Sequence, residues 1–168
     1  MENWIAGYTE SELDTAQERY ALVFPPDLLA LFLEKQPASG YDWRGENPHI
    51  RKMLRWPFER LQFDLEHNGL WWPQWGDRPP TPEERAAILQ AELAKAPKLI
   101  PLIAHRFLPE EPHFSGNPVF SMYGMDTIYY GANLAQYFDN EFNGRHVIGP
   151  ARKIAFWTEL VDYFASPN

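Results

Sequence analysis

Proline is the residue that most constrains this chain, because sixteen prolines are distributed over 168 residues. Proline has no backbone N–H and a fixed φ, so it disfavours helix interiors and central strands and divides the chain into short elements. Thr9–Glu12 has the spacing of a capping box and predicts a helix whose apolar positions continue to Phe24, where two prolines end it. A second helix is predicted over Asp27–Lys35. It is apolar on almost every side and is therefore expected to be buried.

The middle of the chain is predicted to alternate loops and helices. Gln36–Asn47 is a loop, followed by two helical segments, His49–Trp56 and Pro57–His67, which are interrupted at the proline. Leu70–Pro80 contains three tryptophans and three prolines and predicts an aromatic loop. Thr81–Pro97 begins with an N-cap residue, a proline at the first helical position and a glutamate at the third, so it predicts a helix that the last proline ends.

Strand patterns follow in the second half of the chain. Leu99–Ala104 is a short apolar run, and Val119–Tyr123 and Thr127–Tyr130 flank a three-residue turn, as in a β-hairpin. Two more helices are predicted, one capped by Asn133 and one beginning at Pro150.

The predicted fold class is α+β, with a small central, mainly antiparallel sheet surrounded by helices. A chain of this length buries about 70% of its unfolded surface, which is enough for one good core. Residues 1–168 are therefore expected to form a single domain. The N-terminal helices in residues 1–35 and the C-terminal helix in residues 145–168 are expected to pack on that same core.

Composition excludes several classes of protein. Cysteine is absent, which excludes disulfides, a thiolate nucleophile and metal sites built on cysteine. Met1–Ile5 lacks the regions of a signal peptide, and no stretch approaches the ~18 to 20 apolar residues of a membrane span, so we expect a cytoplasmic protein without membrane contact. The net charge is −8, with a pI near 5.1. Because nucleic acids attract clustered cations, this balance disfavours direct nucleic-acid binding and favours a basic protein partner.

One candidate for chemistry is the cluster formed by Asp64, Glu66 and His67. On a helix, Glu66 points away from the other two, and the i, i+4 histidine pair of a helical zinc site is absent. We therefore expect both carboxylates to be solvated. His67 is expected in the last helical turn, where the helix dipole favours a cation.

A second candidate borders the predicted loop Phe107–Asn117. Its members are titratable or charged residues, namely His105, Arg106, Glu110, Glu111 and His113. They could bind a metal or act as an acid–base pair, but nothing in the spacing defines their geometry, and the chain has no glycine-rich phosphate loop or nucleophile elbow. We expect an interior His105 bonded to a carbonyl and an Arg106 paired with a carboxylate, with no catalytic residue, cofactor or metal.

Two further features could belong to a protein interface. Residues 1–34 contain seven acidic residues against Arg19 alone, and such a surface accelerates association with a basic partner, although a solvated helix face also explains it. The three tryptophans of the aromatic loop could either fill the core or face a partner. The predicted partner-binding residues are Glu10, Glu12, Glu18, Trp71, Trp72 and Trp75.

Three ordered segments stand out from Leu99 onward, namely Leu99–Pro109 (LIPLIAHRFLP), Gly116–Tyr123 (GNPVFSMY) and Asp126–Leu134 (DTIYYGANL). This series of short motifs resembles the SUKH superfamily. Other short segments resemble the same bacterial branch, namely Trp56–Phe58, Asp64–Asn68, Trp71–Gly76 and Phe156-Trp157. The similarity spans most of residues 53–161. It implies a compact α+β domain with a mainly antiparallel sheet and assigns no site residue.

The resemblance also implies a class of function. The superfamily includes bacterial immunity proteins that neutralise contact-dependent or polymorphic toxins, often nucleases, and fungal cell-wall regulators of the Knr/Smi type. We therefore expect a non-enzymatic protein-binding domain, an immunity protein that binds a toxin domain. The alternative is a regulatory or scaffold module of the cell-wall or signalling type, and a third is a small metal-dependent hydrolase that uses His105, Glu110, Glu111 and His113.

Overall fold

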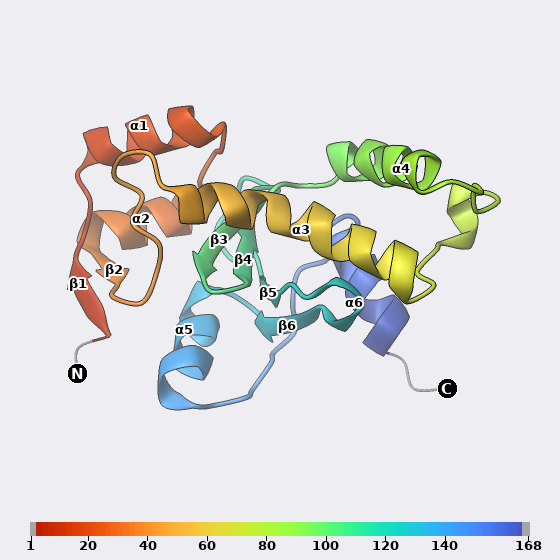
Figure 1. Ribbon diagram of the computed structural model, residues 1–168. Helices are drawn as coiled ribbons and strands as arrows, with labels where there is room; N and C mark the ends of the chain where they lie inside the picture. The colour runs from red at the N-terminus through yellow and green to blue at the C-terminus, as the bar shows by residue number, and fades with distance from the viewer. Residues whose placement is uncertain (1–2, 166–168) are drawn as a thin grey trace.

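The computed structural model describes residues 3–165 and places four short strands side by side in one antiparallel sheet (Figure 1). In spatial order these strands are β3 (Leu99–Ile103), β4 (Arg106–Pro109), β5 (Val119–Ser121) and β6 (Ile128–Gly131). A separate two-stranded sheet pairs β1 (Trp4–Ala6) with β2 (Lys35–Pro37), again antiparallel.

Helices surround the central sheet. Within residues 3–165 there are six α-helices and two short 3₁₀ helices, namely α1 (Glu10–Tyr20), α2 (Pro26–Glu34), α3 (Pro48–His67), η1 (Pro73–Trp75), α4 (Pro82–Lys95), η2 (Gly124–Asp126), α5 (Leu134–Asn143) and α6 (Trp157–Ala165). The predicted α+β class is confirmed, with the helices and both sheets in a single domain (Figure 1).

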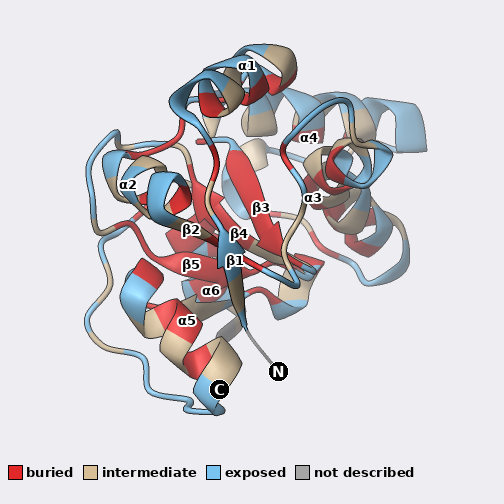
Figure 2. Cartoon of the chain, turned by 90° about the vertical axis from the view of Figure 1, so that its left-hand side faces the viewer, coloured by how far each residue is buried: buried red, intermediate tan, exposed pale blue. Residues whose placement is uncertain are grey.

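The central sheet separates two hydrophobic clusters. Successive side chains of a strand point to opposite faces, and the neighbours Phe107 and Leu108, like Val119 and Phe120, belong to different clusters. One cluster, which we call the α1-side cluster, contains Leu108 and Val119 and also receives side chains from α1, α2 and α5. The other, which we call the α6-side cluster, contains Phe107 and Phe120 and also receives side chains from α3, α4 and α6. Both faces of the sheet are therefore covered, and β3, β4 and β5 are largely buried (Figure 2). The N-terminal helices and α6 thus pack on opposite faces of one sheet.

α3 is a single helix that continues through Pro57, so the prediction of two interrupted segments is wrong. A proline inside a helix removes one backbone hydrogen bond and costs about 3 kcal/mol. Side-chain burial offsets this cost, because Ile50 lies in the α1-side cluster and Leu61 and Leu65 lie in the α6-side cluster. Packing on both sides of Pro57 therefore holds the two segments in one helix that joins the clusters.

α2 is not buried on all sides, in contrast to its prediction. Leu28 and Phe32 are buried in the α1-side cluster, whereas Leu33 is 48% exposed. The physical reason is the position of α2, which covers the cluster from outside and has no further element over its outer side (Figure 2). An apolar sequence on every side of a helix thus did not require burial on every side.

Two helix boundaries also differ from their predictions. α1 ends at Tyr20 rather than near Phe24, because Ala21 adopts a left-handed conformation with φ 53°. α6 begins at Trp157 instead of at Pro150, and the segment between them is irregular. In both cases the apolar positions beyond the helix still pack in the core, so burial alone did not mark the helix end.

β4 lies in a segment that is predicted to be a loop. Its four residues are too few to show a clear period, and pairing with β3 on one side and β5 on the other decides their conformation. β3 contains Pro101, which a central strand would not tolerate, but β3 is the edge strand of the sheet.

Candidate interaction surfaces

α1 presents an acidic ridge to solvent. Glu10, Asp14 and Glu18 follow one another at four-residue spacing, which places them on one side of the helix, and all three are exposed. Among the ion pairs of residues 3–165, none involves these three carboxylates. Two of them, Glu10 and Glu18, are predicted partner-binding residues, and the third, Asp14, extends the ridge between them.

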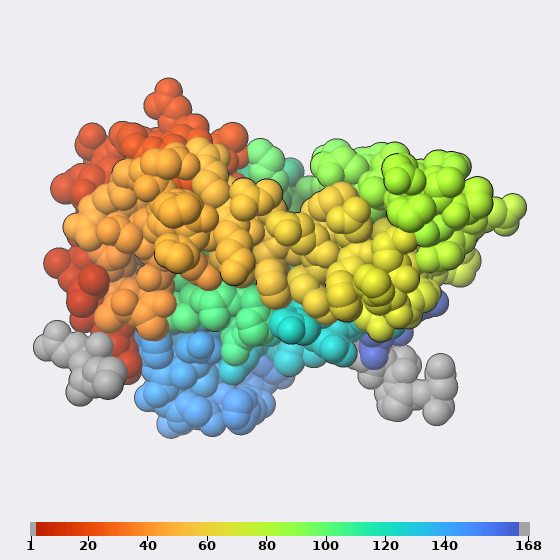
Figure 3. Space-filling model, in the orientation of Figure 1, coloured from red at the N-terminus to blue at the C-terminus, as the bar shows by residue number. Residues whose placement is uncertain are grey.

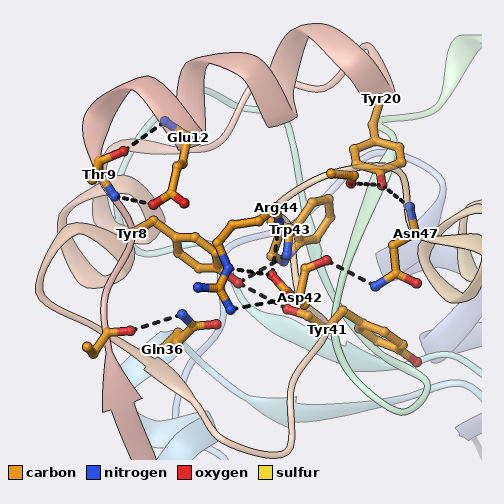
Figure 4. Close-up of polar contacts among 12 residues, drawn as sticks. Tyr8, Thr9, Glu12, Tyr20, Gln36, Tyr41, Asp42, Trp43, Arg44 and Asn47 are labelled. Atoms are coloured by element: carbon orange, nitrogen blue, oxygen red, sulfur yellow. Dashed lines mark hydrogen bonds and ion pairs between the residues drawn. The ribbon is translucent and has the colours of Figure 1, made fainter.

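Glu12 has a structural role instead. Its carboxylate accepts a hydrogen bond from the backbone N–H of Thr9 at 2.9 Å, and its own N–H donates to the Thr9 hydroxyl at 3.1 Å (Figure 4). This is the predicted capping box, which satisfies two backbone donors at the start of α1. Glu12 is therefore occupied by the cap, and two-residue spacing from Glu10 and Asp14 places it on another side of α1 than the ridge.

Buried tyrosine hydroxyls attach α1 and the residue before its cap to the loop that precedes α3. The Tyr8 hydroxyl donates to the Tyr41 carbonyl at 3.2 Å and accepts from the Trp43 N–H at 3.1 Å (Figure 4). The Tyr20 hydroxyl accepts from the Asn47 N–H at 2.8 Å. Burial raises the pKa of Tyr8 to about 12, so this hydroxyl stays protonated as a donor. These contacts hold both ends of α1 in place, and the ridge is consequently presented on a well-anchored helix.

The aromatic loop packs inward. Trp72 is 4% exposed and lies in the α6-side cluster, with its ring 4.7 Å from Trp75 and 5.5 Å from Phe156. Trp71 and Trp75 are half-buried, and the Trp71 indole N–H donates to the Gly76 carbonyl at 2.8 Å. Trp72 therefore packs in the core and is not accessible to a partner. Its prediction as a binding residue is corrected on this ground.

The two predicted parts of the interface do not meet. α1 lies at one end of the molecule and the aromatic loop, with η1, lies at the opposite end (Figure 1). The space-filling view shows the same separation, with the red N-terminal helix at the upper left and the yellow to yellow-green residues around the loop at the right (Figure 3). A combined surface of ridge and tryptophans is therefore not formed.

Asp64 is buried and Glu66 is ion-paired and partly buried, whereas both were predicted to be solvated. Asp64 is 2% exposed and accepts hydrogen bonds from the Met125 N–H at 2.7 Å and from the Asn68 amide at 2.6 Å. Glu66 forms a two-bond ion pair with Arg85 at 2.6 and 2.8 Å, and these bonds lower the pKa of the Glu66 carboxyl. Both carboxylates thus connect α3 to other elements, Asp64 to η2 and Glu66 to α4.

His105 and His113 are not brought together. His105 is half-buried in the turn before β4, whereas Glu110, Glu111 and His113 follow that strand, and four strand residues alone span about 13 Å. Within residues 3–165, no group of three His, Asp or Glu residues is arranged to hold a metal ion.

The neighbours of His105 differ in part from their prediction. Its ring contacts the Arg106 guanidinium at 2.8 Å rather than a carbonyl, and burial, followed by the charge of Arg106, lowers the pKa of His105. Arg106 lies 3.6 Å from the Glu141 carboxylate, so the predicted pairing with a carboxylate is confirmed.

A further patch, partly exposed, runs along α3. The Arg60 guanidinium lies 4.4 Å from the ring centre of Tyr123 and 4.9 Å from that of Phe63, and Trp56 lies 5.7 Å from Tyr123. Phe63 and Tyr123 are 46% and 41% exposed. We call these four residues the α3 aromatic strip. The helical spacing of Trp56, Arg60 and Phe63 is a signal that the sequence contains, but the approach of Tyr123 from the β5–β6 connection is not.

The strip has the residue types that dominate protein interfaces, since aromatic residues and arginine are enriched there.

Comparison of the chain with protein-family models, curated proteins and solved structures finds no match. In the part of the chain that the structure describes, no helix is long and apolar enough to cross a membrane. The fold and its exposed surfaces are thus the basis for a functional proposal.

Proposed function

We propose that this chain is a non-enzymatic protein-binding domain, an immunity protein that binds and neutralises a basic toxin or nuclease domain in the cytoplasm. The proposal does not involve direct contact with nucleic acid or membrane. The observation that carries it is the acidic ridge of α1, on a protein whose net charge is −8. The sequence resemblance to the SUKH superfamily supports the same class of function.

Apart from Glu10, which lies in the first turn, the ridge does not help α1 to form. Like charges four residues apart destabilise a helix by about 0.2–0.5 kcal/mol per pair, and Glu10, Asp14 and Glu18 form two such pairs. Asp and Glu are favoured only in the first helical turn, which Glu18 is far from. A charge pattern that weakens its own helix is better explained by binding to a basic partner than by a contribution to folding.

The ridge and the α3 aromatic strip would contribute different parts of an interface. Exposed charges act at long range and accelerate the encounter with an oppositely charged protein, without requiring contact with every carboxylate. Aromatic and arginine side chains act at short range and slow dissociation once they are desolvated. The strip thus takes the role that the sequence assigns to the tryptophans of the aromatic loop.

The first test is an affinity pull-down from the native host with the tagged protein, at low and moderate salt. A stoichiometric basic toxin or nuclease domain that is lost as salt rises supports the proposal. Co-expression should then restore the growth of cells that carry this toxin. A retained envelope or regulatory protein without toxicity would instead favour the scaffold alternative.

A matched pair of variants tests the ridge on the purified toxin. Glu10→Lys, Asp14→Lys and Glu18→Lys together change the net charge from −8 to −2. The control substitutions Asp77→Lys, Glu111→Lys and Asp162→Lys, at exposed positions outside α1, have the same effect on net charge. The ridge variant should slow association at low salt by about tenfold, and the control by much less. Equal effects of the two variants would mean that only net charge matters and would remove the ridge from the interface.

A further inference from the structure

A groove lies between α2, α5 and β1, at the end of the molecule that faces the viewer in Figure 2. It encloses about 530 Å³, within the range of ligand-binding pockets, and its walls are mainly apolar. The apolar lining comes from Trp4, Leu31, Leu134 and Phe138. Neither the acidic ridge nor the α3 aromatic strip contributes to this lining.

The groove contains one cationic side chain, Lys35, that could bind an anionic group of a ligand. The Lys35 ammonium lies 4.3 Å from the centre of the Trp4 ring, and among residues 3–165 no ion pair involves it. The carboxylate that also lines the groove, Asp27, is already occupied, because its two oxygens accept from the Gly116 N–H at 2.9 Å and from the Leu28 N–H at 3.1 Å. Asp27 keeps its charge, but its oxygens already have donors, whereas the Lys35 ammonium has no hydrogen-bond acceptor or ion-pair partner in the described residues, so a ligand carboxylate would complement Lys35.

The groove continues into a second hollow of about 260 Å³. The two hollows share Trp4 and Phe138 as walls, and Phe142 lines the second one. The second hollow has aromatic walls together with polar residues, among them Asp139. Two adjoining hollows with shared aromatic walls suit an extended polypeptide better than a single compact molecule, since alternate side chains of an extended chain point to the same side. A terminal residue and the residue two positions before it would each place one side chain in a hollow.

We propose that this groove binds the extended C-terminal segment of a partner protein, with its terminal carboxylate beside Lys35 and two apolar side chains in the two hollows. The ammonium recognises the carboxylate, and the rings of Trp4 and Phe138 contact the apolar side chains. This site goes beyond the immunity function proposed above and does not depend on it.

The test is an NMR titration of the ¹⁵N-labelled full chain with two peptides. One is acetyl-Gly-Ser-Gly-Phe-Gly-Phe with a free C-terminal carboxylate, and the other is the same peptide as a C-terminal amide. We expect amide shifts at Leu31, Lys35 and Leu134, and about fivefold tighter binding of the free acid, as an exposed charge pair contributes. Shifts that are confined to other parts of the chain, or equal affinities of the two peptides, would overturn the proposal.

Variants separate the groove from general effects on folding. Lys35→Met should reduce the affinity of the free acid to that of the amide, whereas Lys35→Arg should retain the difference. Leu31→Asp should abolish binding, and Leu33→Asp, exposed on the same helix but outside the groove, should leave it unchanged. The ridge variant should bind the acid peptide normally, so failure of the immunity proposal and failure of this site are distinguishable. Loss of binding in Leu33→Asp, with its fold intact by NMR, would argue against the groove.

Discussion

The acidic ridge of α1 and the aromatic loop at the other end of the molecule began as one predicted interface and have opposite roles in the structure. The carboxylates of the ridge are exposed and have no ion-pair partner in the described residues, while Trp72 of the loop is 4% exposed among other aromatic rings. On α1, charge and helical spacing were reliable guides to exposure, because an isolated carboxylate is costly to bury. Asp64 on α3 is buried in contrast, because donors from Met125 and Asn68 satisfy its carboxylate. The aromatic residues of the loop were not a reliable guide to exposure, because a tryptophan can gain free energy both in the core and at a protein interface.

The largest expected effect comes from the loop. Trp72→Ala removes a buried indole from the α6-side cluster and should lower the free energy of unfolding by about 3–5 kcal/mol. Gln74→Ala, which changes an exposed residue in the same loop, should stay within about 0.5 kcal/mol. Urea denaturation followed by circular dichroism measures both. A stable Trp72→Ala protein would mean that the loop does not belong to the core.

The next effect concerns a carboxylate that, unlike the ridge, is buried. Asp64→Ala leaves the Met125 N–H and the Asn68 amide without their acceptor and should lower the free energy of unfolding by about 1–3 kcal/mol. Glu59→Ala, an exposed acidic residue on the same helix, is the control and should change it by less than about 0.5 kcal/mol. Equal stabilities of the two variants would contradict a structural role of Asp64.

A smaller effect should distinguish Glu12 from its acidic neighbours on α1. Thr9→Ala breaks the capping box and should cost about 1 kcal/mol. Glu12→Lys should also destabilise the protein, because it removes the acceptor of the Thr9 N–H, whereas Asp14→Lys should not. Thermal unfolding compares the three variants. If Glu12→Lys and Asp14→Lys had the same midpoint, Glu12 would belong to the ridge after all.

Neutralising charge in the ridge should raise the free energy of unfolding, in contrast to the substitutions above. Glu18→Gln, far from the first turn of α1, relieves the like-charge pair with Asp14 and should stabilise the protein by a few tenths of a kcal/mol. The gain should shrink as salt is added, because these charges are exposed and screened. Chemical denaturation at two ionic strengths measures it. A loss of stability would show that the ridge has a structural role.

The smallest effect is expected at His105. Its pKa in the folded protein is below the ordinary value of 6.5, so the unfolded chain takes up the proton first as the pH falls. The free energy of unfolding should therefore decrease slightly below pH 6.5, and it should be fully retained above it. His105→Gln should remove this part of the pH dependence. An unchanged slope would assign it to another group.

Much of the helical structure was predictable because its signals are local. Thr81 caps α4 and Asn133 caps α5 as their side chains predict, and the capping box of α1 forms between residues three positions apart. β4 was missed, since its conformation depends on pairing with β3 and β5. The continuity of α3 through Pro57 was missed for a similar reason, because the burial that offsets the proline occurs in two separate clusters.

The candidate sites also differ in whether local sequence patterns could predict them. The exposed ridge was visible in the sequence, where charge and spacing are properties of neighbouring residues. The α3 aromatic strip requires Tyr123 beside Arg60, and the groove requires Trp4, Lys35 and Phe138 together, from three distant segments. By itself, the sequence determined the fold class, the capped helices and the acidic face. Which tryptophan is buried, which carboxylate is paired and where the groove opens were decided by tertiary packing, because each depends on surface that distant segments cover or leave open.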